Sequence, residues 1–261
     1  MFINNFDPIA FKIFFFEIRW YSLAYIFGII FGWIYVKKNL LKNDTSLGAL
    51  FDDLVTYLII GIIIGGRLGY VLIYNPGYYY ENFLEIFMIW NGGMSFHGGL
   101  IGIFISTLVF SNKYNINKYL FLDLIAVAAP IGIFLGRIAN FINSELVGKI
   151  TNVPWAVIFT KVDNFSRHPS QLYEAFLEGI ILFIILNYIF IKKKYKAGIC
   201  SSAFCIFYGI FRIISEFFRE PDMHIGRIIG PLSMGMILSL ILILIGIFIY
   251  FNEKENKFKK F

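Results

Sequence analysis

Seven long apolar segments constrain this chain more than any other feature of its sequence. They cover, approximately, residues 20–36, 54–74, 96–110, 120–141, 172–191, 199–218 and 232–251. Each is close to the ~20 residues that a helix needs to cross a bilayer, although the third is shorter than the others. The pattern predicts an all-α, polytopic integral membrane protein with about seven transmembrane helices.

The segment 83–95 (FLEIFMIWNGGMS) lies between the second and third apolar segments and is only partly apolar. Its polar residues and paired glycines favour an interfacial or re-entrant stretch rather than a membrane-spanning one. An eighth membrane-spanning segment at this position remains the alternative interpretation.

Composition supports a membrane protein and excludes several functional classes. Of the 261 residues, 58% are hydrophobic and 15% are charged, whereas soluble domains average about 45–50% apolar and about 25% charged residues. The net charge of +6 is no sign of nucleic-acid binding, because the lysines cluster between the apolar segments. Cys200 and Cys205 lie in one apolar segment, which predicts buried thiols rather than a disulfide or a metal site.

We expect neither a metal nor another cofactor. The three histidines are far apart in the sequence, and the H-E-x-x-H spacing of a zinc site is absent. The N-terminus has no basic region leading to a small-residue cleavage site, so we expect no cleaved signal peptide.

The distribution of lysine and arginine predicts the orientation of the chain. One set of alternating connections carries 13 cationic residues, and the opposite set carries 7. The first set comprises Lys37, Lys38, Lys42, Lys113, Lys118, Lys192, Lys193, Lys194, Lys196, Lys254, Lys257, Lys259 and Lys260. The second comprises Lys12, Arg19, Lys149, Lys161, Arg167, Arg219 and Arg227. Because the cytoplasmic side carries the excess of positive charge, the N-terminus is expected outside and the C-terminus in the cytoplasm.

Three arginines lie inside apolar segments, at Arg67, Arg137 and Arg212. Each costs about 2.5–3.5 kcal/mol at the centre of a membrane helix, so such residues usually have a function. A guanidinium that stays charged is suited to an anion such as a lipid phosphate. With the predicted orientation, Arg67 and Arg212 lie roughly 9–10 Å below the outer boundary and Arg137 about 6 Å below it. The sequence therefore predicts an anion site in the outer leaflet.

Polar residues surround the second of these arginines. Arg137, Asn140 and Ser144 have the i, i+3, i+7 spacing of one helix face. Asn140 and Asn143 could donate hydrogen bonds to an anion or brace the arginine. The alternative is that these polar residues only cap a helix as it leaves the membrane.

The third arginine belongs to a stripe of functional groups. Tyr208, Arg212 and Glu216 follow one another at i+4 and place a phenol, a guanidinium and a carboxylate on one face. Glu216 could orient the planar guanidinium toward a phosphate, or the pair could simply hold helices together. Arg67, between Gly66 and Gly69, is better explained by close helix packing.

Two histidine-containing blocks are candidates for further roles. His97 has a pair of glycines on each side, which permits an unusual backbone and close approach by a ligand. It could act as a proton acceptor or be an ordinary interfacial residue. The block from His168 to Glu174 either starts a helix or forms a wall of a polar cavity. Tyr21, at the outer end of the first segment, is on physical grounds an ordinary interfacial aromatic residue.

These blocks together resemble one family. The segment 136–148 (GRIANFINSELVG) is similar to the signature of the prolipoprotein diacylglyceryl transferases, which are phosphatidylglycerol-dependent enzymes of the bacterial inner membrane. The resemblance extends over almost the whole chain through RWYSLAY, GGRLGY, FHGGLIG, HPSQLYEA and YGIFRIISEFFREPD. One departure is Ala139, where the signature usually has glycine.

The resemblance implies a reaction and a set of site residues. The thiol of a lipobox cysteine in a prolipoprotein signal peptide attacks the glyceryl carbon of phosphatidylglycerol, a thioether forms, and glycerol phosphate leaves. The residues singled out above on physical grounds fit this reaction, because Arg137 and Arg212 could bind the phosphate. The sequence does not fix which group accepts the thiol proton, and we choose His97 for that role. The remaining residues implied by the resemblance are Tyr21, Asn140, Glu145, Gly148, Tyr208 and Glu216.

The same resemblance implies that residues 1–261 form a single transmembrane catalytic domain, with an extracytoplasmic connection at about 144–170. Its partners would be phosphatidylglycerol, membrane lipid and prolipoprotein signal peptides, and its location the bacterial plasma (inner) membrane. The alternatives are a transporter or a lipid-binding protein with an outer-leaflet anion site. The inner halves of most segments are nearly uncharged, which argues against a transport path.

Overall fold

The structure of the chain is a computed structural model that describes residues 2–14, 16–192, 196–220, 227–229 and 232–252. The predicted cationic residues at 193, 194, 254, 257, 259 and 260, together with His224, lie outside the described residues. Within the described part, six helices are long and apolar enough to cross a membrane. They span Trp20–Leu40, Thr45–Ile73, Lys118–Asn143, Ser170–Lys192, Ile199–Glu216 and Met234–Asn252. The prediction of a helical, multi-pass membrane protein is confirmed.

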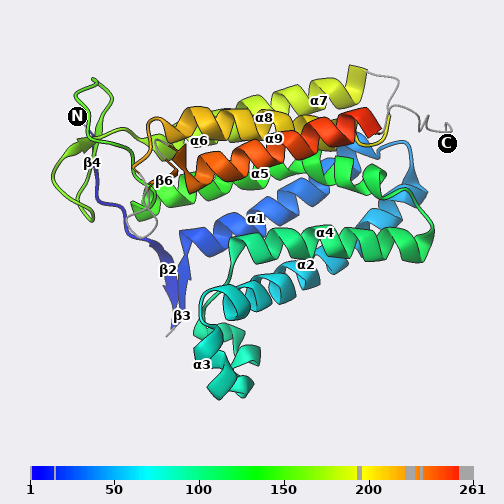
Figure 1. Ribbon diagram of the computed structural model, residues 1–261, viewed down its shortest axis with the longest axis horizontal. Helices are drawn as coiled ribbons and strands as arrows, with labels where there is room; N and C mark the ends of the chain where they lie inside the picture. Colours follow the sequence, from blue (N-terminus) through cyan, green and yellow to red (C-terminus); the bar gives the residue numbers. More distant parts are fainter. Residues whose placement is uncertain (1, 15, 193–195, 221–226, 230–231, 253–261) are drawn as a thin grey trace. The chain divides into compact units, whose positions relative to one another are not determined.

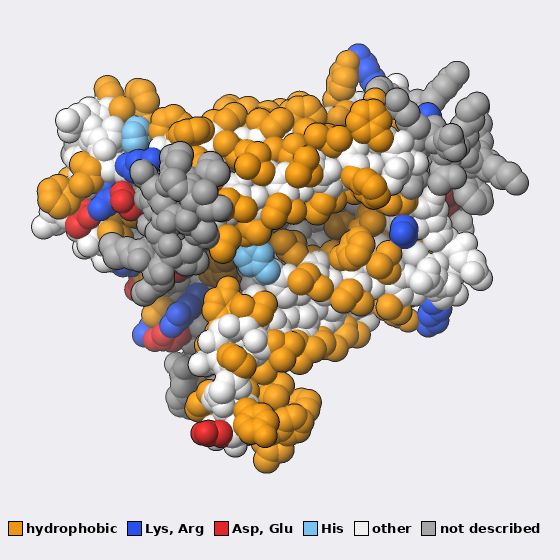
Figure 2. Space-filling view, in the orientation of Figure 1, with side chains coloured by type: hydrophobic (Ala, Val, Ile, Leu, Met, Phe, Trp, Pro, Cys, Tyr) orange, Lys and Arg blue, Asp and Glu red, His pale blue; other side chains and the backbone are white. Residues whose placement is uncertain are grey.

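The chain divides into two compact units, one formed by residues 1–36 and 123–261 and the other by residues 37–122. In Figure 1, helices α5 (Lys118–Asn143), α7 (Leu182–Lys192), α8 (Ile199–Glu216) and α9 (Met234–Asn252) of the first unit lie side by side. Apolar side chains predominate along the visible faces of the helices in Figure 2, as lipid contact requires.

Two contacts fix helices within the first unit. A Cβ added to Gly28 of α1 (Trp20–Tyr35) would lie 2.9 Å from the Cα of Gly132, so α1 packs backbone to backbone against α5. Asp123 of α5 is fully buried and accepts hydrogen bonds from the backbone N–H groups of Gly198 (2.7 Å) and Ser201 (2.6 Å). This carboxylate accepts hydrogen bonds from N–H groups at the start of α8 that have no partner within the helix. Its negative charge also interacts favourably with the positive end of the dipole of α8.

The chain between α5 and α8 contains a π-helix. The chain runs from α6 (Ser170–Glu174) into a π-helix, η4 (Ala175–Ile181), and then into α7. Gly179 of η4 lets this segment approach α5 closely, because a Cβ there would lie 2.7 Å from the Cβ of Phe134. Side chains of α6 and η4 can therefore reach those of α5.

The all-α expectation misses several short strands of the first unit. β1 (Phe2–Asn4) pairs in parallel with β4 (Val157–Phe159), which pairs antiparallel with β5 (Ser166–Arg167). β2 (Ile9–Ile13) and β3 (Phe16–Arg19) form a hairpin before α1, and β6 (Arg227–Ile229) pairs with β7 (Leu232–Ser233). Strands of two to five residues are too short to show a period-2 pattern, and β1 and β4 are far apart in the sequence.

The second unit is built on two helices in close contact, α2 (Thr45–Ile73) and α4 (Phe96–Tyr114). Gly65 of α2 faces Gly98 of α4, where an added Cβ would lie 2.3 Å from the Gly98 carbonyl oxygen. Gly61 and Gly102 meet in the same way one turn away. Small residues at these positions allow the backbones to approach as in other membrane helix pairs.

The segment between α2 and α4 does not cross a membrane. It contains α3 (Pro76–Glu81) and two short 3₁₀-helices, η2 (Phe83–Phe87) and η3 (Ile89–Asn91). These helices have five and three residues, so the alternative of an eighth spanning segment at 83–95 is wrong.

Arg67 holds this segment in place. The guanidinium of Arg67 donates to five backbone carbonyls, and a guanidinium has five N–H groups. The acceptors belong to Glu85, Ile86, Met88, Gly92 and Gly93. The contacts support the packing interpretation of Arg67 and leave it unsuited to binding an anion.

Candidate active site

Arg137 and Arg212 meet around two carboxylates of the α6–η4 segment. Nη1 of Arg137 lies 2.9 Å from Oε2 of Glu174, and Nη2 lies 2.8 Å from Oε2 of Glu178. Nη1 of Arg212 donates to Oε1 of Glu174 and lies 4.0 Å from Oε1 of Glu178. Both carboxylates have side chains with 0% exposure, while those of the arginines keep 15% and 12%. The arginine side chains are therefore more accessible than the carboxylates with which they pair.

Glu216 completes the environment of Arg212. Its Oε2 lies 3.0 Å from Nη2 of Arg212, one helical turn earlier on α8, as the spacing predicts. Ser233 of β7 donates to Oε1 of the same carboxylate at 2.8 Å. Glu216 is thus held from both sides and orients the guanidinium of Arg212.

Tyr208 lies one turn before Arg212 on the same helix. Its ring stacks on Phe204, with centroids 5.5 Å apart and planes 8° from parallel. The phenol is within electrostatic range of Glu178, Arg137 and Arg212. The predicted stripe of Tyr208, Arg212 and Glu216 therefore lies beside the paired arginines and carboxylates.

The cluster is balanced in charge. Nη1 of Arg219 lies 4.0 Å from Oε1 of Glu174, which adds a third guanidinium to three carboxylates. Isolated charges at this depth would carry a desolvation cost of several kcal/mol each, so mutual pairing is required. We define the ion-pair cluster as Arg137, Glu174, Glu178, Arg212, Glu216 and Arg219.

One interpretation of the sequence is that Asn140 and Asn143 brace Arg137. In the structure their side-chain amides bond elsewhere. Asn140 Nδ2 donates to Oε2 of Glu145 at 3.0 Å, and Asn143 Nδ2 donates to Oε1 at 3.2 Å. Ser144 does not continue the helix face, because α5 ends at Asn143 and Ser144 has a φ of +59°. The two amides instead fix the carboxylate of Glu145 at the end of α5.

Gly148 has a steric role that the sequence alone does not reveal. A Cβ there would lie 2.3 Å from the carbonyl oxygen of His168 and 2.6 Å from its Cβ. The Gly148 N–H donates to that same carbonyl at 3.1 Å, and its own carbonyl accepts from Nη1 of Arg167 at 2.9 Å. Gly148 also forms an isolated β-bridge with Arg219. The absence of a side chain lets three chain segments meet beside the ion-pair cluster.

Tyr21 lies in the first turn of α1 and contacts Tyr25, with ring centroids 5.1 Å apart. The two hydroxyls are 3.5 Å apart. Among the residues that the structure describes, no hydrogen bond or ion pair joins Tyr21 to Arg137 or Arg212. Its assignment to the substrate site stays a prediction.

His97 belongs to the second unit and is the second residue of α4. Ser95 caps that helix by accepting from the N–H of Gly98 at 3.2 Å, and its own N–H donates to the Gly66 carbonyl at 2.8 Å. The His97 side chain is exposed. Its proposed role as a base stays a prediction.

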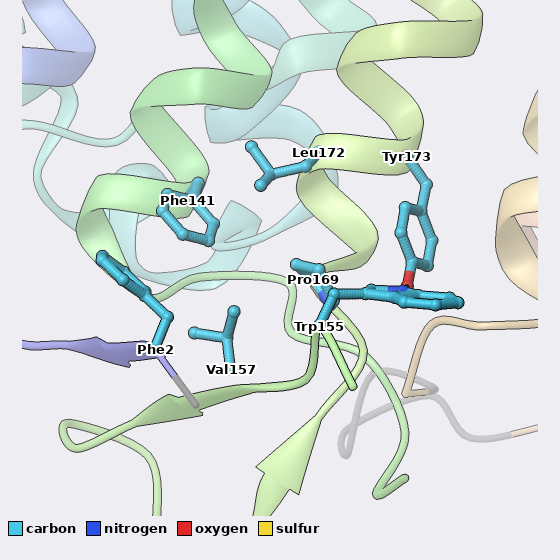
Figure 3. A pocket seen from close by; sticks show the side chains of 7 residues that line it. All are labelled: Phe2, Phe141, Trp155, Val157, Pro169, Leu172 and Tyr173. Atoms are coloured by element: carbon cyan, nitrogen blue, oxygen red, sulfur yellow. The ribbon is translucent and has the colours of Figure 1, made fainter. Parts of the chain in front are cut away.

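His168 belongs to the connection after α5 rather than to the ion-pair cluster. Nε1 of Trp155 donates to the hydroxyl of Tyr173 at 2.7 Å, and that hydroxyl forms a hydrogen bond with Nδ1 of His168 at 3.1 Å. Burial, with a smaller effect of Lys149, lowers the pKa of His168, which favours the neutral ring that can accept this bond. In Figure 3, the Trp155 ring and Tyr173 form one wall of an apolar pocket.

Sequence reasoning misses the carboxylates at the centre of the site. It leaves the block from His168 to Glu174 as either a helix start or a cavity wall; a helix does begin in this block, at Ser170, but the pairing of Glu174 with the arginines is not predicted. It gives Glu178 no role. A usable signal was present, since Glu174 and Glu178 stand at i and i+4 in an otherwise apolar run. No group of three or more His, Cys, Asp or Glu side chains suited to a metal occurs among the described residues.

The family model for prolipoprotein diacylglyceryl transferase matches residues 8–252. The chain belongs to the prolipoprotein diacylglyceryl transferase family. It is 50% identical over 259 residues to a phosphatidylglycerol–prolipoprotein diacylglyceryl transferase of Rickettsia bellii (strain OSU 85-389), covering 98% of each chain. The enzyme of the same name from Rickettsia typhi is 52% identical over 249 residues, which cover 94% of this chain and 96% of the relative.

Membership of the prolipoprotein diacylglyceryl transferase family confirms the resemblance. Ala139, the departure noted in the sequence, lies in α5 and is buried. Arg137 lies in α5 within the segment 136–148, and Arg212 and Glu216 lie in α8, so these members of the ion-pair cluster belong to sequence blocks that carry the resemblance.

Proposed function

We propose that the chain transfers the diacylglyceryl group of phosphatidylglycerol to the lipobox cysteine of a prolipoprotein. The single observation that carries the proposal is the partly accessible arginine pair, Arg137 and Arg212, in a chain half identical to enzymes of that name. The alternatives, a transporter or a lipid-binding protein, have no support from the relatives.

The chemistry uses the arginines at the phosphate. A carbon–sulfur bond forms between the cysteine and the glyceryl carbon, the bond from that carbon to the phosphate oxygen breaks, and glycerol phosphate leaves with the bonding electrons. The thiol proton is lost, because the thiolate is the nucleophile. Arg137 and Arg212 stabilise the negative charge that grows on the leaving phosphate, and Glu216 holds the guanidinium of Arg212 in place.

We assign the remaining residues by their surroundings and the family resemblance. Tyr208 lines the ion-pair cluster, and Asn140, Glu145 and Gly148, at and after the end of α5, are assigned to substrate binding. Tyr21 is assigned to substrate binding on the resemblance alone. The functional unit is residues 1–261, a single catalytic domain with an extracytoplasmic connection at 144–170, in the bacterial inner membrane.

His97 is the proposed acceptor of the thiol proton, since a neutral imidazole is the usual base near neutral pH. Replacing His97 by Gln is expected to lower kcat by about 10²–10⁴-fold, the usual contribution of a general base. Binding of phosphatidylglycerol, measured with a fluorescent lipid, is expected to stay within about threefold of wild type. A variant with wild-type kcat would remove His97 from the mechanism.

The membrane topology proposed is seven spans with the N-terminus outside and the C-terminus in the cytoplasm. Support comes from the distribution of positive charge and from α4, whose 19 residues are nearly the length that a span needs. α4 also packs against α2 through glycines, as membrane helix pairs do.

Thiol labelling tests this topology. In a chain with Cys200 and Cys205 replaced by Ser, we introduce Asn164→Cys or Asn112→Cys, both at exposed positions. A membrane-impermeant maleimide should label position 164 in intact cells and position 112 only after the membrane is opened. The reverse pattern would contradict the proposed orientation.

Release of glycerol phosphate tests the function directly. The purified protein in detergent receives phosphatidylglycerol and a lipobox peptide, and glycerol phosphate is measured by a coupled enzyme assay. We expect release of glycerol phosphate that depends on both phosphatidylglycerol and the lipobox peptide. A lipid-binding protein or transporter would release none.

A further inference from the structure

The carboxylates of Glu174 and Glu178 are placed where they control the arginines. Glu174 uses a different oxygen for each arginine, Oε2 toward Arg137 and Oε1 toward Arg212. Glu178 accepts from Nε of Arg137 at 3.2 Å and from Nη2 at 2.8 Å through one oxygen. The plane of the Arg137 guanidinium is therefore set by Glu178, and the distance between the two arginines is set by Glu174.

The arginines keep donors for a substrate after these contacts. Contacts with carboxylates involve three N–H groups of Arg137 and two of Arg212 within the described residues. Each guanidinium has five N–H groups, so both retain more than one. Phosphate recognition by arginine uses such N–H groups in pairs with a fixed direction.

Stability alone is a weak explanation for this arrangement. Buried ion pairs often contribute little to stability, because the desolvation of the charges offsets their attraction, and apolar replacements can be neutral or stabilising. Both carboxylates are at 0% exposure. Glu178 also lies in η4, a π-helix, and π-helical turns are rare and frequent at functional sites.

We infer that Glu174 and Glu178 are positioning residues, which hold the guanidinium groups of Arg137 and Arg212 in the orientation that binds the phosphate of the lipid substrate. This inference rests on the proposed function. Neither carboxylate touches the reacting atoms in this account. Each acts through an arginine, and the phosphate is bound by the N–H groups that the carboxylates leave available.

Glu→Gln substitutions test the inference because they keep the shape of the side chain. In Glu178→Gln, the amide oxygen can take the place of Oε2 as acceptor of the Arg137 Nε and Nη2 hydrogen bonds, but the negative charge is lost. We expect kcat per folded molecule to fall about 10–100-fold and KM for phosphatidylglycerol to stay within about threefold. Glu178→Asp should recover part of the loss, because it restores the charge.

Glu174→Gln is expected to lower kcat more than Glu178→Gln does. Its amide NH₂ would face the N–H groups of one arginine, so the bridge between Arg137 and Arg212 is broken. We expect kcat to fall at least about 100-fold. Folding is judged by elution as a single peak in detergent. If Glu174→Gln fails this criterion, Glu178→Gln decides the question, since Arg137 there keeps its contact with Glu174.

A double-substitution cycle separates a positioning role from a merely structural one. If Glu178 acts through Arg137, then Glu178→Gln should cause less than about a threefold further loss of kcat in an Arg137→Lys background. An independent, multiplicative loss would overturn the inference. So would kcat within threefold of wild type for both Glu→Gln variants.

Two controls keep the test of the inference apart from that of the proposed function. Glu17→Gln removes a carboxylate from an exposed pair with Lys12, at 2.7 Å, and should leave kcat unchanged. Wild-type protein that yields no product would mean that the proposed function is wrong. Active wild-type protein with fully active Glu174 and Glu178 variants would mean that only the positioning inference is wrong.

Discussion

Replacing Arg212 by Ala is expected to lower kcat for diacylglyceryl transfer about 10²–10³-fold. The estimate follows from the loss of one preorganised donor to a developing oxyanion, and Arg137→Ala should act similarly. Both substitutions also leave buried carboxylates without their cation, so a lower melting temperature in detergent is expected as well. The measurement is the initial rate of peptide modification at saturating phosphatidylglycerol, divided by the amount of monodisperse protein.

Arg212→Lys is the matched comparison for that prediction. An ammonium keeps the charge but cannot contact Glu174 and Glu216 at once through a planar fork, as Arg212 does. A clear loss of rate in the lysine variant would show that geometry matters. Wild-type rates in Arg212→Ala would refute the phosphate-binding role altogether.

Replacing Gly148 by Ala is expected to reduce activity at least about 100-fold and to lower the melting temperature by several degrees. The new Cβ would overlap the His168 carbonyl, at 2.3 Å, and this contact is with backbone rather than with a movable side chain. The displaced chain would disturb the β-bridge to Arg219, whose guanidinium faces Glu174. Large losses of this kind are typical of strain at a tightly packed backbone position.

Gly136→Ala is the control in the same sequence block. A Cβ at Gly136 would meet nothing within 4 Å, and the residue lies inside α5. Alanine there should preserve activity and stabilise the helix by roughly 0.5–1 kcal/mol. Equal losses in the two variants would mean that helix flexibility, rather than close packing at Gly148, explains the effect.

Local periodicity predicted the parts of the site that lie on single helices. The spacing of Tyr208, Arg212 and Glu216 placed them on one face, and Glu216 does contact Arg212. The long apolar segments likewise predicted the helices, since their length reflects the bilayer. Both signals are contained within about 20 residues of chain.

Contacts between distant segments could not be predicted in the same way. Arg137 and Glu178 are 41 residues apart in sequence, and Arg212 and Glu174 are 38 apart. Their pairing depends on how α6 and η4 pack against α5 and α8, which a single sequence does not specify. Gly148 is a similar case, because its steric role exists only once His168 has folded back beside it.

The polar residues at the end of α5 show how a local pattern can mislead. The spacing of Arg137, Asn140 and Ser144 suggests one polar helix face, but α5 ends at Asn143. Asn140 and Asn143 both donate to Glu145 instead of assisting the arginine. Asparagine readily makes such local hydrogen bonds at helix ends, and here this preference prevails over the helical spacing.

The central claim is tested most directly by the intact mass of a lipobox peptide after incubation with the purified protein and phosphatidylglycerol. One peptide has a single cysteine, and the matched peptide has serine in its place. The proposed function predicts a diacylglyceryl mass on the cysteine peptide only, stable to mild alkali at the thioether while the ester-linked acyl chains are released. An unmodified cysteine peptide, with folded protein and lipid both present, would contradict it.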